Sequence, residues 1–322
     1  MRIALLAYDQ CLASELFALR DVLAMGDRIS ALRGGRRLEV SIVTASEREV
    51  CTAGGARIAA NPPVPGIDLL VVPGFDLLDR DGIDLRLAAL QPEIDLLRTI
   101  SAGGVAVASI CVGAFLLGAA GLLDERRATT AWLFGDELAR RHPRARIDRD
   151  ALLVEDGGVT TTGAFTASHD LALHLIDRRL GAAAARATRN IALIEGHVAG
   201  QGPFVDPSLL PGRATAFSAR VETWLRERLG EPYSLTALAD GLGASRRTLL
   251  RRYKAERGQP PLTFLQGERI EQAKLLLEQT ALGVAEIAHR VGYEDVSAFR
   301  TLFGRRTGAT PGSYRQRFQR RA

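Results

Sequence analysis

Apolar positions in the first 180 residues of this 322-residue chain follow an alternating pattern. Short continuous apolar runs, typical of strands buried on both faces, occur at 3–7, 40–45, 69–73 and 105–109. Helices are predicted between and after them, over 12–25, 92–102, 113–120 and 167–180. A hairpin is predicted at 151–155 and 159–162, across Asp156-Gly157-Gly158. Strands that alternate with helices predict an α/β domain whose mostly parallel sheet is covered on both faces.

The pattern changes near residue 200. Residues 200–212 are rich in glycine and proline and have no periodicity, which is typical of a linker. Helical periodicity returns over 214–229 and continues towards the C-terminus. We therefore predict an α/β domain over 1–195, a linker over 196–213 and an all-α domain over 214–322.

Residues 235–314 contain one helix-turn-helix pattern written twice. In each copy an alanine that lets two helices cross closely precedes a turn glycine by four positions. These pairs are Ala239 with Gly243 and Ala288 with Gly292, and the second copy has one extra residue in its turn. Core positions are predicted at Leu235, Leu238, Leu242, Leu249, Tyr253, Ile287, Val291, Phe299 and Phe303.

The second helix of each copy carries arginine on its free face. Each helix includes a serine suited to capping its start, Ser245 in the first copy and Ser297 in the second. Two such copies, joined by the amphipathic segment 262–279, indicate DNA binding more specifically than one copy would. By contrast, Arg228, Arg269 and Arg290 are expected to be ordinary solvated helix residues.

Charge is divided unevenly along the chain, whose net charge is +5. Residues 213–322 hold 20 Lys and Arg against 11 Asp and Glu, a net +9, whereas the remaining residues hold 22 against 26, a net −4. The basic part is the one with the repeated motif, as a surface that binds phosphates requires.

The three cysteines, Cys11, Cys51 and Cys111, are widely spaced and form no CxxC pair. This argues against a disulfide framework or a structural zinc site and favours a reducing cytoplasm. Residues 101–123 carry no charge and are long enough to span a membrane. Their five glycines fit a buried strand, a sharp turn and a helix better, so we expect no membrane partner.

The repeated motif and the segment 308–315, GATPGSYR, resemble the DNA-binding domain of AraC/XylS-type transcription regulators over residues 214–322. The resemblance implies two recognition helices in successive major grooves of double-stranded DNA. The bases would be faced by Arg247, Leu250 and Arg251 in one groove and by Val296, Ser297 and Thr301 in the other. The other contacts, mainly to phosphates, would come from Arg246, Thr248, Arg252, Arg300, Arg305 and Arg306.

The segment 108–115, ASICVGAF, places Cys111 at a strand-to-helix turn like a nucleophile elbow, where a helix N-terminus favours the thiolate. Together with 116–132, it resembles the DJ-1/PfpI domain (class I glutamine amidotransferase-like, a flavodoxin-like parallel sheet sandwich) found fused to AraC-type domains in GlxA-like regulators. Relatives usually carry histidine where this chain has Ala131, and Glu15 matches the acidic neighbour of the cysteine.

A cysteine with a glutamate and no histidine is a poor hydrolase, because no group is placed to move protons. We therefore predict no catalytic residue and a candidate effector pocket of Glu15, Cys111, Val112 and Ala131. His169 and His174 do not share a helical face, so no metal or other cofactor is predicted.

Together these features predict a cytoplasmic, sequence-specific transcription regulator and not an enzyme. The expected partners are DNA, a small-molecule effector, a second copy of the chain and RNA polymerase. Two alternatives stay open for the N-terminal domain. One is a Cys111-dependent amidase or glyoxalase-like enzyme with an accessory DNA-binding domain, and the other is a dimerisation domain without an effector.

Overall fold

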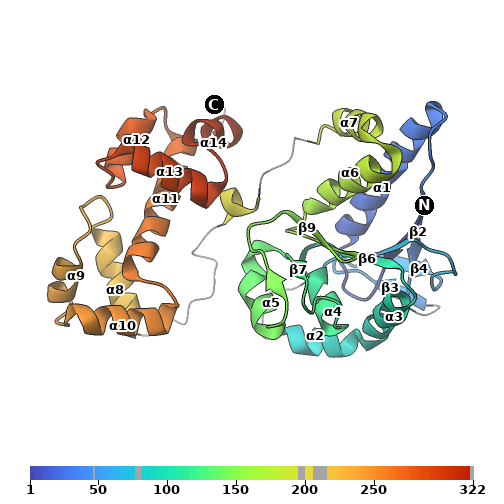
Figure 1. The fold of residues 1–322 in the computed structure, drawn as a ribbon, viewed down its shortest axis with the longest axis horizontal. Helices are drawn as coiled ribbons and strands as arrows, with labels where there is room; N and C mark the ends of the chain where they lie inside the picture. The colour runs from blue at the N-terminus through green and yellow to red at the C-terminus, as the bar shows by residue number, and fades with distance from the viewer. Residues whose placement is uncertain (46–47, 77–81, 195–199, 206–215, 320–322) are drawn as a thin grey trace. The chain divides into compact units, whose positions relative to one another are not determined.

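The computed structural model describes residues 1–45, 48–76, 82–194, 200–205 and 216–319. The chain divides into two compact units, Met1–Gln201 and Gly202–Ala322 (Figure 1). The division lies inside the predicted linker 196–213. Within that linker, residues 200–205 are described, and residues 196–199 and 206–213 lie outside the described residues.

The first unit is built on a six-stranded sheet in the order β2-β1-β5-β6-β10-β9. All neighbours pair in parallel except β9 with β10, the predicted hairpin. The strands are β1 (Arg2–Leu6), β2 (Glu39–Val43), β5 (Leu69–Val72), β6 (Ala106–Ser109), β9 (Leu153–Asp156) and β10 (Val159–Thr162). The predicted α/β sheet is therefore confirmed, strand by strand.

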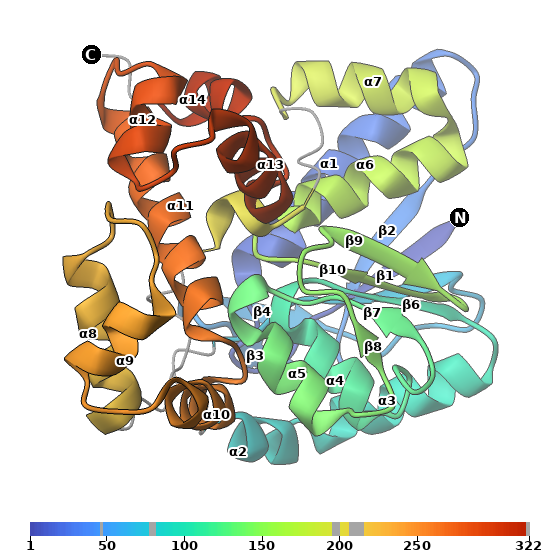
Figure 2. The same cartoon turned by 60° about the vertical axis from the view of Figure 1, so that its left-hand side comes forward.

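Helices cover both faces of this sheet. In Figure 1, α1 (Ala13–Leu32), α6 (Ala167–Leu180) and α7 (Ala182–Ile191) lie on one side. The other side carries α2 (Ile83–Ala89), α3 (Gln91–Ala102), α4 (Ala114–Ala119) and α5 (Gly135–Arg141). Short strand pairs form apart from the main sheet, β3 (Arg48–Cys51) with β4 (Arg57–Ala60) and β7 (Arg127–Ala128) with β8 (Arg146–Ile147); Figure 2 shows the second pair beside α5.

The helices of this unit differ from the prediction in two ways. The first helix, predicted to end at residue 25, continues to Leu32, and α2, α5 and α7 were not predicted. Gly26 lies inside α1 and does not end it. A Cβ at this position would lie 2.5 Å from Ile176 Cδ1 on α6. The glycine instead allows α1 and α6 to approach each other closely, a packing role that the local pattern does not reveal.

The uncharged segment 101–123 folds as the strand, turn and helix expected of it. It contains β6, a 3₁₀ turn at Cys111–Gly113 and α4. No helix in the described part of the chain is both long and apolar enough to cross a membrane.

The second unit is all-α where it is described, apart from a 3₁₀ turn at Gly202–Phe204. It contains α8 (Ala216–Glu227), α9 (Leu235–Gly241), α10 (Arg246–Arg257), α11 (Pro261–Gln279), α12 (Val284–Arg290), α13 (Val296–Thr307) and α14 (Pro311–Phe318). Figure 2 shows α11 joining two helical groups. Its Leu265 packs in the core of the first group, and Ile270, Ala273 and Leu277 pack in the core of the second.

The helix-turn-helix pairs are α9 with α10 and α12 with α13. The predicted turn glycines, Gly243 and Gly292, both have positive φ, at 64° and 85°. Of the predicted core residues, Leu235 and Leu242 are half-buried against the first core and the others are buried. The repeat therefore folds as the sequence indicates.

Candidate functional site

The two predicted recognition helices have matching ends. Each of α10 and α13 has 12 residues and ends at a left-handed glycine, Gly258 or Gly308. Ser245 caps α10 by accepting a hydrogen bond from the Thr248 amide at 3.2 Å, as predicted. The cap of α13 is Asp295, which accepts from the Ser297 amide at 2.7 Å. The prediction that Ser297 caps the helix was wrong, because the extra turn residue moves it inside the first turn.

Most predicted DNA contacts lie on the surface of these helices. Leu250 and Val296 are half-buried. The exposed members of the set are Arg246, Arg247, Thr248, Arg251, Arg252, Ser297, Arg300, Thr301, Arg305 and Arg306. Their opposite faces seat the helices through the buried pairs Leu249 with Tyr253 and Phe299 with Phe303.

Two of these arginines also make contacts within the unit. Arg252 Nε donates to Glu256 Oε1 at 2.9 Å, and its guanidinium lies 4.2 Å from the centroid of the Phe217 ring. Arg306 Nη2 donates to the Thr263 carbonyl oxygen at 3.2 Å. Each group therefore has fewer free donors for DNA than its exposure alone indicates.

Arg269, expected to be solvated, is 5% exposed. It lies on α11, and its guanidinium donates to the carbonyl oxygens of Leu229 and Glu231, which follow α8. It also lies 5.3 Å from the centroid of the Tyr293 ring in the second turn. One side chain thus ties the first helix-turn-helix group to the turn of the second, and burial lowers its pKa.

Cys111 occupies the sharp turn between β6 and α4 with a φ of 54°. Its amide donates to the Gly163 carbonyl oxygen at 3.0 Å, and its own carbonyl accepts from Thr130 Oγ1 at 2.8 Å. The turn also depends on Gly113, because a Cβ there would lie 2.6 Å from the carbonyl oxygens of Val72 and Pro73. The backbone around Cys111 is therefore fixed on three sides by other segments.

Glu15 on α1 reaches this turn, as predicted. Its side chain is buried, and its Oε2 accepts from the Gly74 amide at 2.6 Å. A Cβ on Gly74 would lie 3.2 Å from both Cys111 Cβ and Glu15 Oε2, so the carboxyl group and the cysteine flank this glycine. Val112 and Ala131 are buried in the same unit, 2% and 5% exposed.

Burial dominates the chemistry of this pair. Desolvation raises the pKa of Glu15 to about 7. Desolvation, followed by the charge of Glu15, raises the pKa of the Cys111 thiol to about 12. The expectation that a helix N-terminus favours the thiolate was therefore wrong, because a six-residue helix does not offset the loss of solvent.

Gln201, a linker residue in the sequence interpretation, is 2% exposed and belongs to this surrounding structure. Its Oε1 accepts from the amides of Trp132 and Ala164 at 3.0 and 3.1 Å, and its Nε2 donates to the carbonyl oxygens of Thr130 and Ala151 at 2.9 and 3.1 Å. These bonds join the two loops that hold the Cys111 backbone. Nothing in the local Gly-Gln-Gly sequence indicates such contacts.

The histidines do not assemble a metal site. His169 Nδ1 lies 3.1 Å from the Thr166 carbonyl oxygen, and His174 Nε2 lies 3.2 Å from Glu155 Oε2. Among the described residues, no three His, Cys, Asp or Glu side chains are grouped to bind a metal ion.

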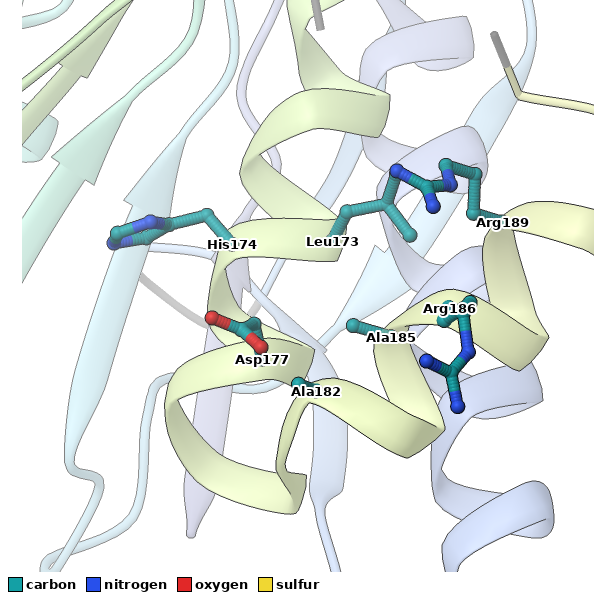
Figure 3. Close-up of a pocket in the computed structure, with 7 residues that line it drawn as sticks. All are labelled: Leu173, His174, Asp177, Ala182, Ala185, Arg186 and Arg189. Atoms are coloured by element: carbon teal, nitrogen blue, oxygen red, sulfur yellow. The ribbon is translucent and has the colours of Figure 1, made fainter. Parts of the chain in front are cut away.

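A surface pocket lies elsewhere on the first unit, between α6 and α7. Figure 3 shows its lining side chains, Leu173, His174, Asp177, Ala182, Ala185, Arg186 and Arg189. None of the predicted effector-pocket residues lines it, so this hollow and the Cys111 turn are separate features.

Comparison with known proteins identifies both units. Residues 1–178 match the DJ-1/PfpI family and residues 238–317 match a helix-turn-helix domain. The HTH-type transcriptional regulator GlxA of Rhizobium meliloti is 33% identical over 231 residues, which are 69% of this chain and 68% of that protein. The HTH-type transcriptional regulator CdhR of Pseudomonas aeruginosa is 29% identical over 236 residues, 71% of this chain and 68% of that protein.

The family match covers the unit that contains Cys111, the domain match covers α10 and α13, and the relatives are named as regulators. The chain therefore belongs to the DJ-1/PfpI family and, through its AraC-type helix-turn-helix domain, to the DNA-binding transcription regulators.

Proposed function

We propose that this regulator reads two adjacent major grooves, with α10 in one and α13 in the other. The supporting observation is the pair of equal-length helices, each seated by buried aromatic or leucine side chains and each exposing a polar face. Arg247, Leu250 and Arg251 face bases in one groove, and Val296, Ser297 and Thr301 face bases in the other. Arg246, Arg300, Arg305 and Arg306, whose side chains are exposed, contact phosphates.

The test is fluorescence anisotropy of the purified chain on duplexes tiled from its genomic neighbourhood and on random duplex, at several salt concentrations. Tight binding to one tile with a large ratio over random DNA supports the proposal and yields the operator. Weak binding to every duplex with a steep salt dependence contradicts it, because that is the signature of phosphate contacts alone.

Arg251→Ala and Arg305→Ala then separate base contacts from phosphate contacts. Loss of Arg251 is expected to cost about 1–3 kcal/mol of operator binding and to relax specificity. Loss of Arg305 weakens all sequences alike. Equal loss on operator and random DNA for Arg251→Ala would show that this side chain faces a phosphate.

For the first unit we propose a sensing role without turnover, with an effector bound beside Glu15 and Cys111. A thiol whose pKa is raised to about 12 is protonated at neutral pH, and Ala131 supplies no base where relatives carry histidine. The check is an assay for amidase and glyoxalase activity. Turnover that Cys111→Ser abolishes would replace this proposal with the enzymatic one.

The route from that unit to DNA runs along the chain through Gln201. Gln201 is fixed to the loops around Cys111. Only Gly202 and Pro203 separate it from Phe204, whose ring packs 5.5 Å from that of Phe318 in α14. Lys274 Nζ on α11 donates to the Val205 carbonyl oxygen at 3.0 Å. Gln201, held in the first unit, and Phe204, held in the second, are thus three positions apart in the chain, and we propose that a shift at Gln201 is passed along this segment.

Because coupling between two sites is reciprocal, DNA serves as the probe for this route. Operator binding should change the hydrogen exchange of the Trp132 and Ala164 amides, and Gln201→Ala should remove the change. Gln91→Ala, at an exposed position of the same unit, is the control. Exchange at these amides that does not respond to the operator in the wild-type chain would contradict the proposed route.

The proposal also includes partners that the family suggests. A second copy of the chain and RNA polymerase are the expected macromolecular partners at the promoter. Cys11, Cys51 and Cys111 are all free thiols, as the proposed action in the cytoplasm requires. Sedimentation of the free chain and of its operator complex tests whether the active species is a dimer.

A further inference from the structure

The matching ends of α10 and α13 allow their residues to be paired position by position. The caps Ser245 and Asp295 correspond, as do the terminal glycines Gly258 and Gly308, each pair separated by 50 positions in the chain. The buried seats Leu249 and Tyr253 correspond to Phe299 and Phe303 at the same spacing. Because helix length, seat and ends all agree, residues at this spacing occupy equivalent places on the two exposed faces.

The pairing gives two base-facing positions common to both helices, with different chemistry. Arg247 corresponds to Ser297, and Arg251 corresponds to Thr301. All four side chains are exposed. The other proposed base-facing residues, Leu250 and Val296, pair with Arg300 and Arg246, which are proposed phosphate contacts. At the two shared positions, α10 thus carries arginine and α13 carries a residue with a hydroxyl group.

The guanidinium groups on α10 are free to read bases. Within the described residues, Arg247 and Arg251 make no ion pair or side-chain hydrogen bond, unlike their neighbour Arg252. An unpaired arginine on a major-groove helix binds guanine O6 and N7 through two parallel hydrogen bonds, the commonest specific contact of a side chain with a base. Two such residues one turn apart fit two guanines.

The corresponding groups on α13 discriminate less. Thr301 Oγ1 donates its proton to the Ser297 carbonyl oxygen at 2.9 Å, so its hydroxyl is not free as a donor. A threonine in this state offers its methyl group, which suits the thymine C5 methyl, and serine hydrogen-bonds several bases. Arg300 and Arg305 flank this face and attract phosphate whatever the sequence.

We infer that the two half-sites of the operator differ in base preference and in how strongly they discriminate. The α10 half-site contains guanines and carries most of the discrimination, whereas the α13 half-site favours thymine and tolerates substitution. This inference rests on the proposed function, since it assigns base preferences to the two grooves. It makes Arg247 and Arg251 the residues that determine specificity.

The experiment is selection of duplexes from a random library by the purified full chain, followed by affinity measurements on the selected site. One half-site should emerge with fixed guanines and the other with a weaker thymine preference. Replacing one G·C base pair of that half-site with A·T should lower affinity about 5- to 150-fold, the range for one bidentate contact. Replacements in the other half should change affinity by only a few-fold.

Reciprocal substitutions identify which helix reads which half. Arg247→Ser with Arg251→Thr gives α10 the chemistry of α13, and should erase the guanine preference in one half while the other half is unchanged. Ser297→Arg with Thr301→Arg does the reverse and should create a guanine preference in the thymine half. All four positions are exposed, so circular dichroism and melting of the variants should match the wild-type chain.

The outcomes separate two kinds of failure. A selection that enriches no sequence would overturn the proposed function. Enrichment of one site with equal discrimination in both halves would leave the function intact and overturn the asymmetry. The inference would also be overturned if the variant Arg247→Ser with Arg251→Thr still preferred guanine in the same half-site.

Discussion

The Cys111 turn and the recognition helices are both central to the proposed function, but they are constructed differently. Side chains on regular helices make the recognition surface, and their positions follow from a cap, a seat and a helical period. The Cys111 turn is held by groups from distant segments, namely the backbone of Gly74 and Gly163 and the side chain of Gln201. We therefore expect the recognition surface to keep its fold when its exposed side chains are exchanged, and the Cys111 turn to depend on the residues packed around it.

The largest effect expected from this difference is at Gly113. In Gly113→Ala the new Cβ would lie 2.6 Å from the backbone carbonyl oxygens of Val72, at the end of β5, and of Pro73 after it, and neither can rotate away as a side chain could. We expect the first unit to lose about 3 kcal/mol of stability, the upper end of the range for overpacking, measured by denaturant unfolding. Gly54→Ala is the matched control, since nothing lies within 4 Å of its Cβ position. Equal stability of the two variants would mean that the turn is not tightly packed.

The same contrast explains what could be predicted from the sequence. The strands of the main sheet, the longer helices of the sheet layers except α7, and the repeat follow local patterns and were predicted closely, whereas the short helices α2 and α5 were not predicted. Gln201 was assigned to a linker because its partners lie 37 to 71 positions away in the chain. Asp295 was missed as a cap because one inserted residue changes the register of a short turn. Local patterns hold no information about partners brought together only by the fold.

A second test of the buried site uses pH. Burial raises the pKa of Glu15 from 4.5 to about 7, so the folded chain holds this proton more tightly than the unfolded chain does. The resulting stability is fully present below pH 4.5 and is lost as pH rises towards 7. Glu15→Gln keeps an acceptor for the Gly74 amide and removes the titration. At pH 8 the variant should be more stable than the wild-type chain by about 3 kcal/mol relative to their difference at pH 4, from about 1.4 kcal/mol per pKa unit.

Glu137→Gln provides a control of opposite sign for that experiment. A hydrogen bond from Arg140 lowers the pKa of Glu137 below its usual value. The stability from this pair is therefore present above the normal glutamate pKa and lost on acidification. Its variant should be slightly destabilised at neutral pH and unchanged in acid. A pH profile of Glu15→Gln parallel to that of the wild-type chain would mean that Glu15 is not buried.

Arg269 lies in the DNA-binding unit, but like the Cys111 turn it is buried and held by backbone groups of distant segments. It therefore tests whether buried contacts of this kind matter more for stability than exposed ones in both units. Arg269→Met preserves much of the side-chain volume but removes the charged donors to the carbonyl oxygens of Leu229 and Glu231. We expect a loss of about 2–3 kcal/mol in the stability of the second unit. Arg290→Met, at an exposed residue paired with Glu286, should change stability by under about 1 kcal/mol. Similar melting of both variants would mean that the solvated interpretation of Arg269 was correct.

The smallest effect is expected at Arg252, where an exposed arginine already has partners. Its guanidinium stacks on Phe217 and pairs with Glu256, so DNA must compete with contacts that exist in the free chain. Each phosphate contact adds about 0.9 to the slope of log affinity against log salt concentration. Arg246→Ala should lower that slope by about this amount, and Arg252→Ala should leave it nearly unchanged. If Arg252→Ala lowers the slope equally, the Glu256 pair opens on binding and Arg252 contacts a phosphate. If only Arg246→Ala lowers the slope, an exposed arginine on a recognition helix contacts phosphate only when its side chain has no partner within the protein.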